Sequence, residues 1–242
     1  MISLSQFTVK LTSACTFRCL GCALWETPVE NERDTIGKLI SQNRFFTQFP
    51  KRKLAHLVGG DAMCYTQLAS TISFFNYQGI IPVLWTHGVW NLATWDTVLP
   101  HIRYVVLFLP CPDDAQYKTL TGYPGWADFQ RIVSYLRAKD VHVTLNFRVT
   151  PGLLEFLPDV QFFAQQHGCK LLIHYHPSQF DRYQVDYIRR YWWIEDIYIL
   201  RSLGAPKSLC QTIPYDALRS RYQMSLNLGK EFLIYLKKLI RL

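Results

Sequence analysis

Short apolar runs alternate with longer amphipathic stretches along this chain. The runs are rich in β-branched and aromatic residues and predict strands at 6–12, 54–58, 81–86, 103–109, 141–148 and 170–175. The stretches between them predict helices at 33–48, 65–78, 91–100, 125–139 and 155–167. Strands that alternate with helices form parallel units with right-handed crossovers. The pattern therefore predicts an α/β fold, either an open doubly wound sheet or a partial barrel.

The predicted fifth strand, VHVTLNFR, favours the barrel because its two faces differ. Its polar face carries His142, Thr144, Asn146 and Arg148. A parallel strand with helices on both sides is apolar on both faces, so one polar face indicates a strand that lines a cavity. His174 and His176 share one side of the next strand. For these two histidines we expect pocket lining or ordinary hydrogen bonding rather than a second metal site.

The pattern changes after about residue 178, where an aromatic and basic segment leads into a long C-terminal run. We expect a partial (β/α)6 barrel core over residues 1–178 and a C-terminal helical extension over 179–242. The extension contains a helical stripe with cations opposite, made of Phe232, Leu233, Leu236, Leu239 and Ile240. This helix is expected to close the barrel or to dock a partner.

The composition predicts a folded protein of a reducing compartment. Of the 242 residues 49% are hydrophobic and 18% are charged, which suits a large core. The N-terminus has no continuous apolar run, so we expect no signal peptide, and seven cysteines fit the cytoplasm better than a disulfide framework. Residues 65–95 contain no Lys, Arg, Asp or Glu, but their polar residues and the interruption from Gly79 to Pro82 predict two buried elements rather than a membrane span.

The formal net charge of +8 is spread over several separate clusters of lysine and arginine. No zinc finger or aromatic RNA-binding strand accompanies them, so we expect solvated surface and no nucleic-acid partner. Asp113 and Asp114 follow the fourth predicted strand and are interpreted as a turn and helix cap.

The segment SACTFRCLGCAL places Cys15, Cys19 and Cys22 on one tight loop. Zinc would need a fourth ligand from a remote histidine or from one of the isolated cysteines, Cys64, Cys111, Cys169 and Cys210. An iron–sulfur cluster held by three cysteines instead leaves one iron open for a substrate or cofactor. The four isolated cysteines are expected to be buried, inert thiols, which leaves a single cluster.

CTFRCLGC follows the first predicted strand and resembles the cluster signature of the radical S-adenosylmethionine (radical SAM) superfamily. Two further segments support the resemblance: LVGGD at the end of the second strand is similar to the family's GGE motif, and THG at the end of the third is similar to TNG. All three lie where a βα barrel carries its active face. The departures are Gly21, at a position that is often aromatic, and an Asp in place of the motif's Glu.

The resemblance implies a TIM-like partial barrel of the radical SAM type, with one four-iron four-sulfur (4Fe–4S) cluster on the three loop cysteines and SAM on the open iron. It implies cofactor contacts from Gly59, Gly60, Asp61 and Thr86. Asn146 and Arg148 are candidates for the ribose because they share the inner face of the fifth strand, with a structural salt bridge as the alternative for Arg148. An electron donor such as flavodoxin or ferredoxin would drive reductive cleavage of SAM to a 5′-deoxyadenosyl radical, which takes a hydrogen atom from the substrate.

The segment from Asp113 to Thr150 looks like the corresponding stretch of radical SAM enzymes that modify ribosomally made peptides (RiPPs). The resemblance implies a compact enzyme that acts on a peptide with the help of a separate peptide-recognition protein, as spliceases do when they excise part of a backbone. One alternative is an activating enzyme for a glycyl-radical enzyme. A second is a structural zinc protein, which would explain neither LVGGD nor THG.

Overall fold

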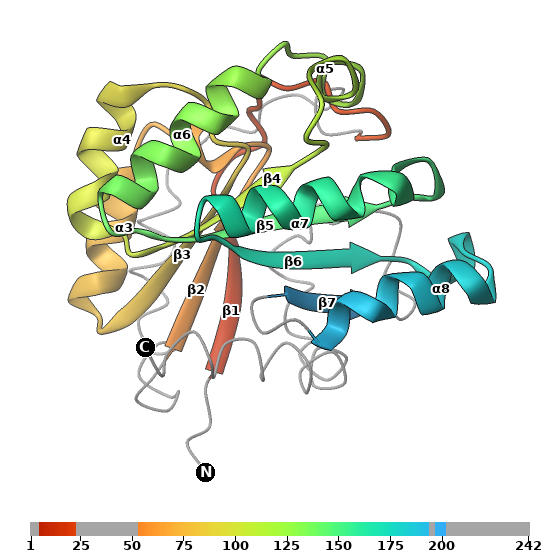
Figure 1. Ribbon diagram of the computed structural model, residues 1–242. Helices are drawn as coiled ribbons and strands as arrows, with labels where there is room; N and C mark the ends of the chain where they lie inside the picture. The colour runs from red at the N-terminus through yellow and green to blue at the C-terminus, as the bar shows by residue number, and fades with distance from the viewer. Residues whose placement is uncertain (1–4, 23–52, 194–196, 202–242) are drawn as a thin grey trace.

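The computed structural model describes residues 5–22, 53–193 and 197–201, which build a parallel sheet with helices along its outer face (Figure 1). The strands are β1 (Ser5–Lys10), β2 (Lys53–Val58), β3 (Ile80–Thr86), β4 (Tyr104–Leu109), β5 (His142–Val149), β6 (Lys170–Tyr175) and β7 (Ile197–Arg201). Each strand pairs in parallel with the next, in the order β1 to β7. A doubly wound sheet would reverse its strand order, so this order excludes it and confirms the winding of a barrel.

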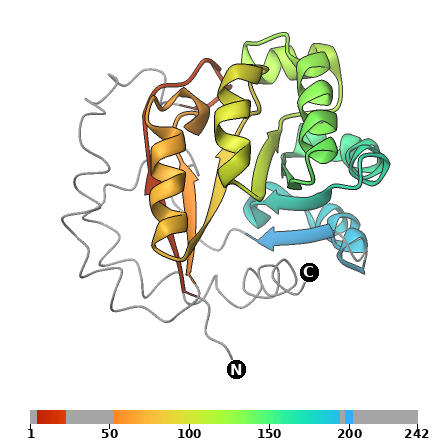
Figure 2. The ribbon, with the colours of Figure 1, turned by 90° about the vertical axis from the view of Figure 1, so that its left-hand side faces the viewer.

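The barrel is partial, because β1 and β7 lie at the two ends of the strand order and do not pair with each other. Figure 2 shows the strands following an arc from β1 to β7, with helices α3, α4 and α6 on its outer side. This open arc is the predicted partial barrel, with seven parallel strands in the described chain rather than the six expected. The seventh lies within residues 179–242, which were expected to be helical; the proposed domain boundary stays a prediction.

The described helices are α3 (Leu68–Tyr77), α4 (Leu92–Val98), α5 (Asp114–Thr121), α6 (Trp126–Ala138), α7 (Leu157–Gln166) and α8 (Arg182–Arg189). Short 3-10 turns lie at η2 (Ala62–Cys64), η3 (Leu99–His101), η4 (Pro151–Phe156), η5 (Pro177–Gln179) and η6 (Arg190–Trp193). Four predicted helices and all six predicted strands are confirmed within a few residues. The predicted helix at 33–48, Cys210 and the C-terminal stripe lie outside the described residues.

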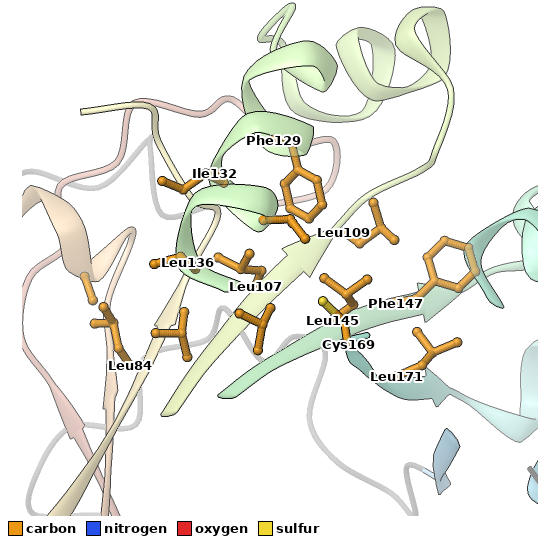
Figure 3. Close-up of a cluster of buried hydrophobic side chains, with 14 of the residues drawn as sticks. Leu84, Leu107, Leu109, Phe129, Ile132, Leu136, Leu145, Phe147, Cys169 and Leu171 are labelled. Atoms are coloured by element: carbon orange, nitrogen blue, oxygen red, sulfur yellow. The ribbon is translucent and has the colours of Figure 1, made fainter. Parts of the chain in front are cut away.

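The side chains on the outer face of the sheet form an apolar core beneath α6 (Figure 3). Strands β3, β4 and β5 contribute Leu84, Leu107, Leu109, Leu145 and Phe147, and α6 contributes Phe129, Ile132 and Leu136. None of these side chains is more than 1% exposed. Because successive strand residues point to opposite faces, this packing turns the alternate set of residues toward the inner, concave face.

The inner face of β5 is polar, as predicted, and its neighbours are mixed. Asn146 lies in register with Phe108 of β4 and Leu172 of β6, and Arg148 lies beside His174. The inner side chains therefore include an amide, aromatic rings and basic groups that the apolar core leaves available to a ligand.

The interruption between α3 and β3 also confirms its prediction, since Gly79 there has a φ of 67°. In the parts of the chain that the structure describes, no helix is both long and apolar enough to cross a membrane.

One buried histidine of the inner face makes the stability of the fold depend on pH. Trp85 donates its Nε1–H to Nδ1 of His56 at 3.0 Å, and burial lowers the pKa of His56 from 6.5 to about 4. As the pH falls from 6.5 toward 4, His56 binds a proton in the unfolded chain but stays neutral in the folded protein. The free energy of unfolding of the wild type should therefore fall by up to about 3 kcal/mol from this group.

Denaturant unfolding at pH 7 and at pH 4.5 tests this, with His56→Gln as the comparison, since the amide oxygen of glutamine still accepts the Trp85 hydrogen bond. We expect a smaller loss of stability in the variant. Equal losses in both proteins would show that His56 does not carry the effect.

Candidate functional site

The loop that carries the three cysteines leaves β1 and lies against the end of β2. Leu11 N–H donates to the carbonyl of Val58 at 2.7 Å, which extends the pairing of the two strands past β1. Gly60 N–H then donates to Thr12 O at 2.9 Å, and Asp61 N–H donates to Ala14 O at 2.8 Å. These bonds fix the start of the cysteine loop on the segment that follows β2.

Gly59 and Gly60 make this contact possible because they have no side chain. A Cβ atom on Gly60 would lie 2.4 Å from Ala14 O and 2.5 Å from Ser13 O, and one on Gly59 would lie 2.8 Å from Thr12 O. The sequence predicts that two glycines allow a ligand to approach the backbone. In the structure the group that approaches them is the cysteine loop itself, and their contact with a cofactor stays a prediction.

A second support for the loop comes from the end of α5. Arg18 N–H donates to Thr121 O at 2.7 Å, and Leu20 N–H donates to Leu120 O at 2.8 Å. Gly122 ends α5 in the left-handed conformation with a φ of 68°, and a Cβ atom there would lie 3.0 Å from the Cβ of Arg18. The segment LTG at 120–122 therefore supports the cysteine loop through these backbone bonds, a role that is not predicted from the sequence. The glycine after a helix end was its only signal.

The cysteine loop ends in a tight turn. Cys22 N–H donates to Cys19 O at 3.0 Å, and Gly21 within this turn has a φ of 73°. A turn of this kind favours glycine at the position with positive φ. This accounts for the glycine at position 21.

The donor chemistry of the loop fits an iron–sulfur cluster. Cys15, Cys19 and Cys22 are half-buried, and none of the cysteines in the described part of the chain forms a disulfide. Burial, together with Asp61, Cys19 and Cys64, raises the pKa of Cys15 to about 12, so this thiol ionises readily only when a cation binds. No group of three metal-binding side chains is assembled among the described residues.

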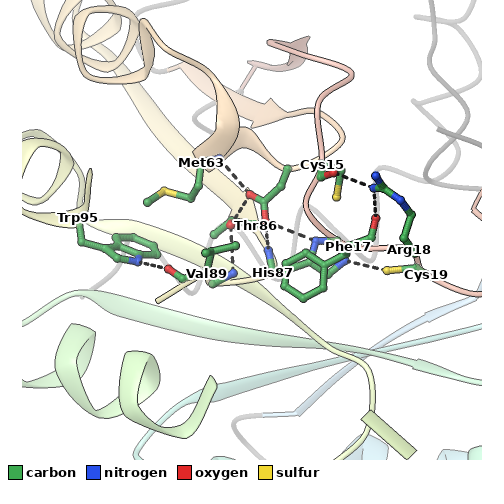
Figure 4. Close-up of polar contacts among 11 residues, drawn as sticks. Cys15, Phe17, Arg18, Cys19, Met63, Thr86, His87, Val89 and Trp95 are labelled. Atoms are coloured by element: carbon green, nitrogen blue, oxygen red, sulfur yellow. Dashed lines mark hydrogen bonds and ion pairs between the residues drawn. The ribbon is translucent and has the colours of Figure 1, made fainter. Parts of the chain in front are cut away.

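Asp61 connects the end of β2 to the end of β3. Its carboxylate is 1% exposed and accepts hydrogen bonds from Met63 N–H at 2.9 Å and the Thr86 hydroxyl at 2.5 Å on Oδ1, and from His87 N–H at 3.1 Å on Oδ2. Burial alone would raise the pKa of Asp61, but the hydrogen bonds and the nearby His87 lower it overall. Thr86 also accepts from Gly88 N–H at 3.0 Å. LVGGD and THG therefore form one hydrogen-bonded unit (Figure 4).

His87 extends this unit to the cysteine loop. Its Nδ1 lies 3.6 Å from Asp61 Oδ2 and its Nε2 lies 3.5 Å from Cys19 Sγ (Figure 4). The ring stacks on Phe17 at a centroid distance of 4.5 Å and contacts Phe108 at 5.1 Å. Burial would lower the pKa of His87, but Asp61 and Cys19 outweigh it and raise the pKa to about 10. In the sequence His87 is part of THG, but it is not among the site residues predicted there.

Asn146 and Arg148 lie on the inner face beyond this unit. Phe108 contacts the His87 ring, and Asn146 is the register partner of Phe108. At about 4.8 Å per strand, Asn146 lies roughly 10 Å from His87. Asn146 is 4% exposed, and its Oδ1 has no hydrogen-bond partner in the described structure. Arg148 is exposed and forms no ion pair with any described residue, so the alternative of a structural salt bridge gains no support there.

The other residues singled out in the sequence are two histidines, the aspartate before α5 and the isolated cysteines. His174 has its pKa lowered to about 4 by burial, Arg148 and His176, and His176 Nδ1 shares a 2.7 Å hydrogen bond with the hydroxyl of Ser178. Asp113 caps α5 by accepting from Gln116 N–H at 2.8 Å, which confirms the predicted cap. Cys111 and Cys169 are buried, as predicted, whereas Cys64 is only half-buried. It lies close enough to Cys15 to influence its ionisation.

Known proteins resemble this chain in fold but not in sequence. No family model matches the chain, and no curated protein matches it. The structure of SuiB from Streptococcus suis bound to S-adenosylmethionine matches with a TM-score of 0.66 at 12% identity, over 82% of this chain and 50% of that one. SuiB bound to the precursor peptide SuiA gives 0.67 at 12%, over 82% and 49%. The structure of anSMEcpe with bound AdoMet and the Kp18Cys peptide gives 0.60 at 12%, over 72% and 51%.

The chain thus has the partial-barrel fold of these proteins and spans about half the length of each. At this identity the likeness concerns the fold alone, and the chemistry has to be argued from the site.

The contact of Gly60 with the cysteine loop can be tested without any cofactor. Gly60→Ala should destabilise the fold by about 1–3 kcal/mol, because its Cβ meets backbone atoms that cannot turn away. The amide hydrogens of Gly60 and Asp61 should also exchange faster in the variant, as measured by hydrogen exchange and mass spectrometry.

Gly152→Ala is the matched control, since a Cβ atom there meets nothing within 4 Å. It should leave stability and exchange near the wild-type values. Unchanged exchange in Gly60→Ala would contradict the close approach of the two segments.

Proposed function

We propose that the chain is a radical SAM enzyme. The observation that carries this proposal is the convergence of three sequence segments at the carboxyl ends of β1, β2 and β3. The cysteine loop, LVGGD and THG lie far apart in sequence, yet backbone bonds to Gly60 and Asp61 and the side chains of Asp61 and His87 join them into one unit. The fold likeness to structures that contain SAM supports the same proposal.

In this proposal Cys15, Cys19 and Cys22 hold one 4Fe–4S cluster. When bound, the cluster supplies one electron to SAM from a donor such as flavodoxin or ferredoxin. The chain's own task is to fix the loop, keep its thiolates together and hold the substrate against the radical. The contacts of the cysteine loop with Gly59, Gly60 and LTG fix the loop.

SAM would lie over the inner face next to this loop. Gly59, Gly60, Asp61 and Thr86 would border its methionine end, where an ammonium group would add a further hydrogen bond to a carboxylate that already accepts three. Asn146 and Arg148 would reach the polar groups of its other end, as donors and acceptors that the fold itself does not use among the described residues. The aromatic rings of Trp85 and Phe108 contact each other and would exclude water from the space between.

A ribosomally made peptide is the substrate class that we propose. SuiB has been seen with the precursor peptide SuiA, and anSMEcpe with the Kp18Cys peptide. The segment that resembles RiPP enzymes contains α5 and α6, and its LTG part supports the cysteine loop. We further propose that a separate protein recognises the peptide and that the enzyme works in the cytoplasm. The net charge of +8 suits an acidic leader. Splicease-type excision is one form of the proposed reaction.

The alternative of a zinc site gains one specific observation. Cys64 contributes to the raised pKa of Cys15, although no three metal-binding side chains of the described residues are assembled around a metal site. The alternative of a glycyl-radical activase would use the same cluster site and would differ in its protein substrate.

Replacing single cysteines separates the cluster from the zinc site. We expect Cys19→Ala to lose its iron and to form no 5′-deoxyadenosine from SAM after anaerobic reconstitution and reduction, because one of three ligands is missing. Cys64→Ser should retain both iron and SAM cleavage. Metal analysis and mass spectrometry provide the two measurements.

The opposite pattern would support zinc. If the wild-type protein binds zinc, forms no deoxyadenosine and loses its metal in both variants, four cysteines form a structural site and the enzyme proposal is wrong.

Asn146 offers a test of where SAM binds. Asn146→Leu should weaken SAM binding to the cluster-loaded protein about tenfold, because an amide that fits the ligand is lost. The control is Thr71→Val, which also removes a buried oxygen without a described partner, but from α3 on the outer face. Equilibrium binding of SAM should be unchanged in the control, and equal affinities in all three proteins would exclude Asn146 from the site.

A further inference from the structure

The imidazole of His87 is held on four sides by groups from three separate segments. Phe17 of the cysteine loop stacks on the ring at an interplanar angle of 25°, and Phe108 of β4 contacts it at 5.1 Å. Nδ1 faces the carboxylate of Asp61, and Nε2 faces the sulfur of Cys19. The side chain is 13% exposed, so the ring has little freedom to rotate away from these partners.

Donor and acceptor chemistry determines what the contact with Cys19 becomes when a metal binds. A cysteine that ligates a metal is a thiolate, which can only accept a hydrogen bond. At the 3.5 Å contact the sulfur would then be the acceptor, so the contact is a hydrogen bond when Nε2 of His87 carries the hydrogen. Asp61 fixes the backbone beside the ring by accepting His87 N–H at 3.1 Å and lies 3.6 Å from its other nitrogen.

We propose that His87 is a positioning residue for the metal centre: held by Asp61 and stacked on Phe17, it donates a hydrogen bond to the Cys19 ligand of the cluster and raises the cluster's reduction potential. This inference rests on the proposed function, since it requires an iron–sulfur cluster on the loop. Neither sequence pattern nor fold likeness assigns such a role to this histidine.

The direction of the effect follows from charge. Reduction adds an electron to a cluster whose sulfur ligands are already negative, and a hydrogen bond to one of those sulfurs stabilises the added charge. Removing the donor therefore makes the cluster harder to reduce. Phe17 ties this donor to the loop itself, so the ring and the sulfur would move together if the loop shifts on cluster binding.

The test is an EPR-monitored redox titration of the reconstituted holoprotein without SAM. His87→Phe keeps the aromatic stack and removes both nitrogens, and His87→Gln keeps a polar side chain with an N–H donor. His56→Gln is the matched control, because His56 is a buried inner-face histidine that hydrogen-bonds to Trp85.

We expect His87→Phe to lower the equilibrium constant for reduction about tenfold, a shift of about 59 mV to more negative potential for a one-electron couple. His87→Gln should fall between this variant and the wild type, and His56→Gln should match the wild type. Equal potentials in His87→Phe and the wild type would overturn the proposal. So would an equal shift in the His56→Gln control.

Loss of the cluster is also decisive. If His87→Phe fails to hold a cluster while His87→Gln holds one, the donor to Cys19 is upheld. If both lose it while His56→Gln keeps it, His87 serves cluster binding and the tuning role is wrong. A wild-type protein that carries zinc and no iron sinks the proposed function itself, which the metal content shows before any potential is measured.

Discussion

The close approach of the cysteine loop to Gly59 and Gly60 is the contact on which the rest of the site depends. It places backbone carbonyls where a single methyl group would collide, at 2.4 Å from the Cβ position of Gly60. Because the loop lies there, Asp61 can bind Ala14 through its backbone while its carboxylate reaches Thr86 and His87. The same placement brings Cys19 to the His87 ring. One steric requirement thus arranges the ends of three strands.

The two faces of the sheet have different roles: the outer face stabilises the fold, and the inner face carries the polar groups of the site. The outer face packs Leu107 and Leu145 under α6 and supplies stability to the edge that carries the polar site. The inner face carries groups whose bonding the fold leaves incomplete, such as Oδ1 of Asn146. A rigid apolar layer below and an incompletely bonded polar layer above are what a site needs to hold a ligand in one orientation.

Much of this could be predicted from sequence because it is encoded locally. The alternation in VHVTLNFR indicated the inner face, and the cysteine spacing indicated the loop. Helix α5 was missed because it has only eight residues, although its Asp113 cap was recognised, and β7 was missed because it is defined by its pairing with β6. The partner of the two glycines and the contact of His87 with Cys19, 68 residues away, are properties of three-dimensional contact that no local pattern contains.

The central claim is that the three loop cysteines hold a cluster with one iron open to SAM. EPR spectroscopy of the reconstituted, reduced protein with and without SAM tests it most directly. The account predicts the signal of a reduced 4Fe–4S cluster whose line shape changes when SAM is added, because SAM joins the open iron. A protein that shows no such signal, or a cluster signal that SAM leaves unchanged, would contradict it.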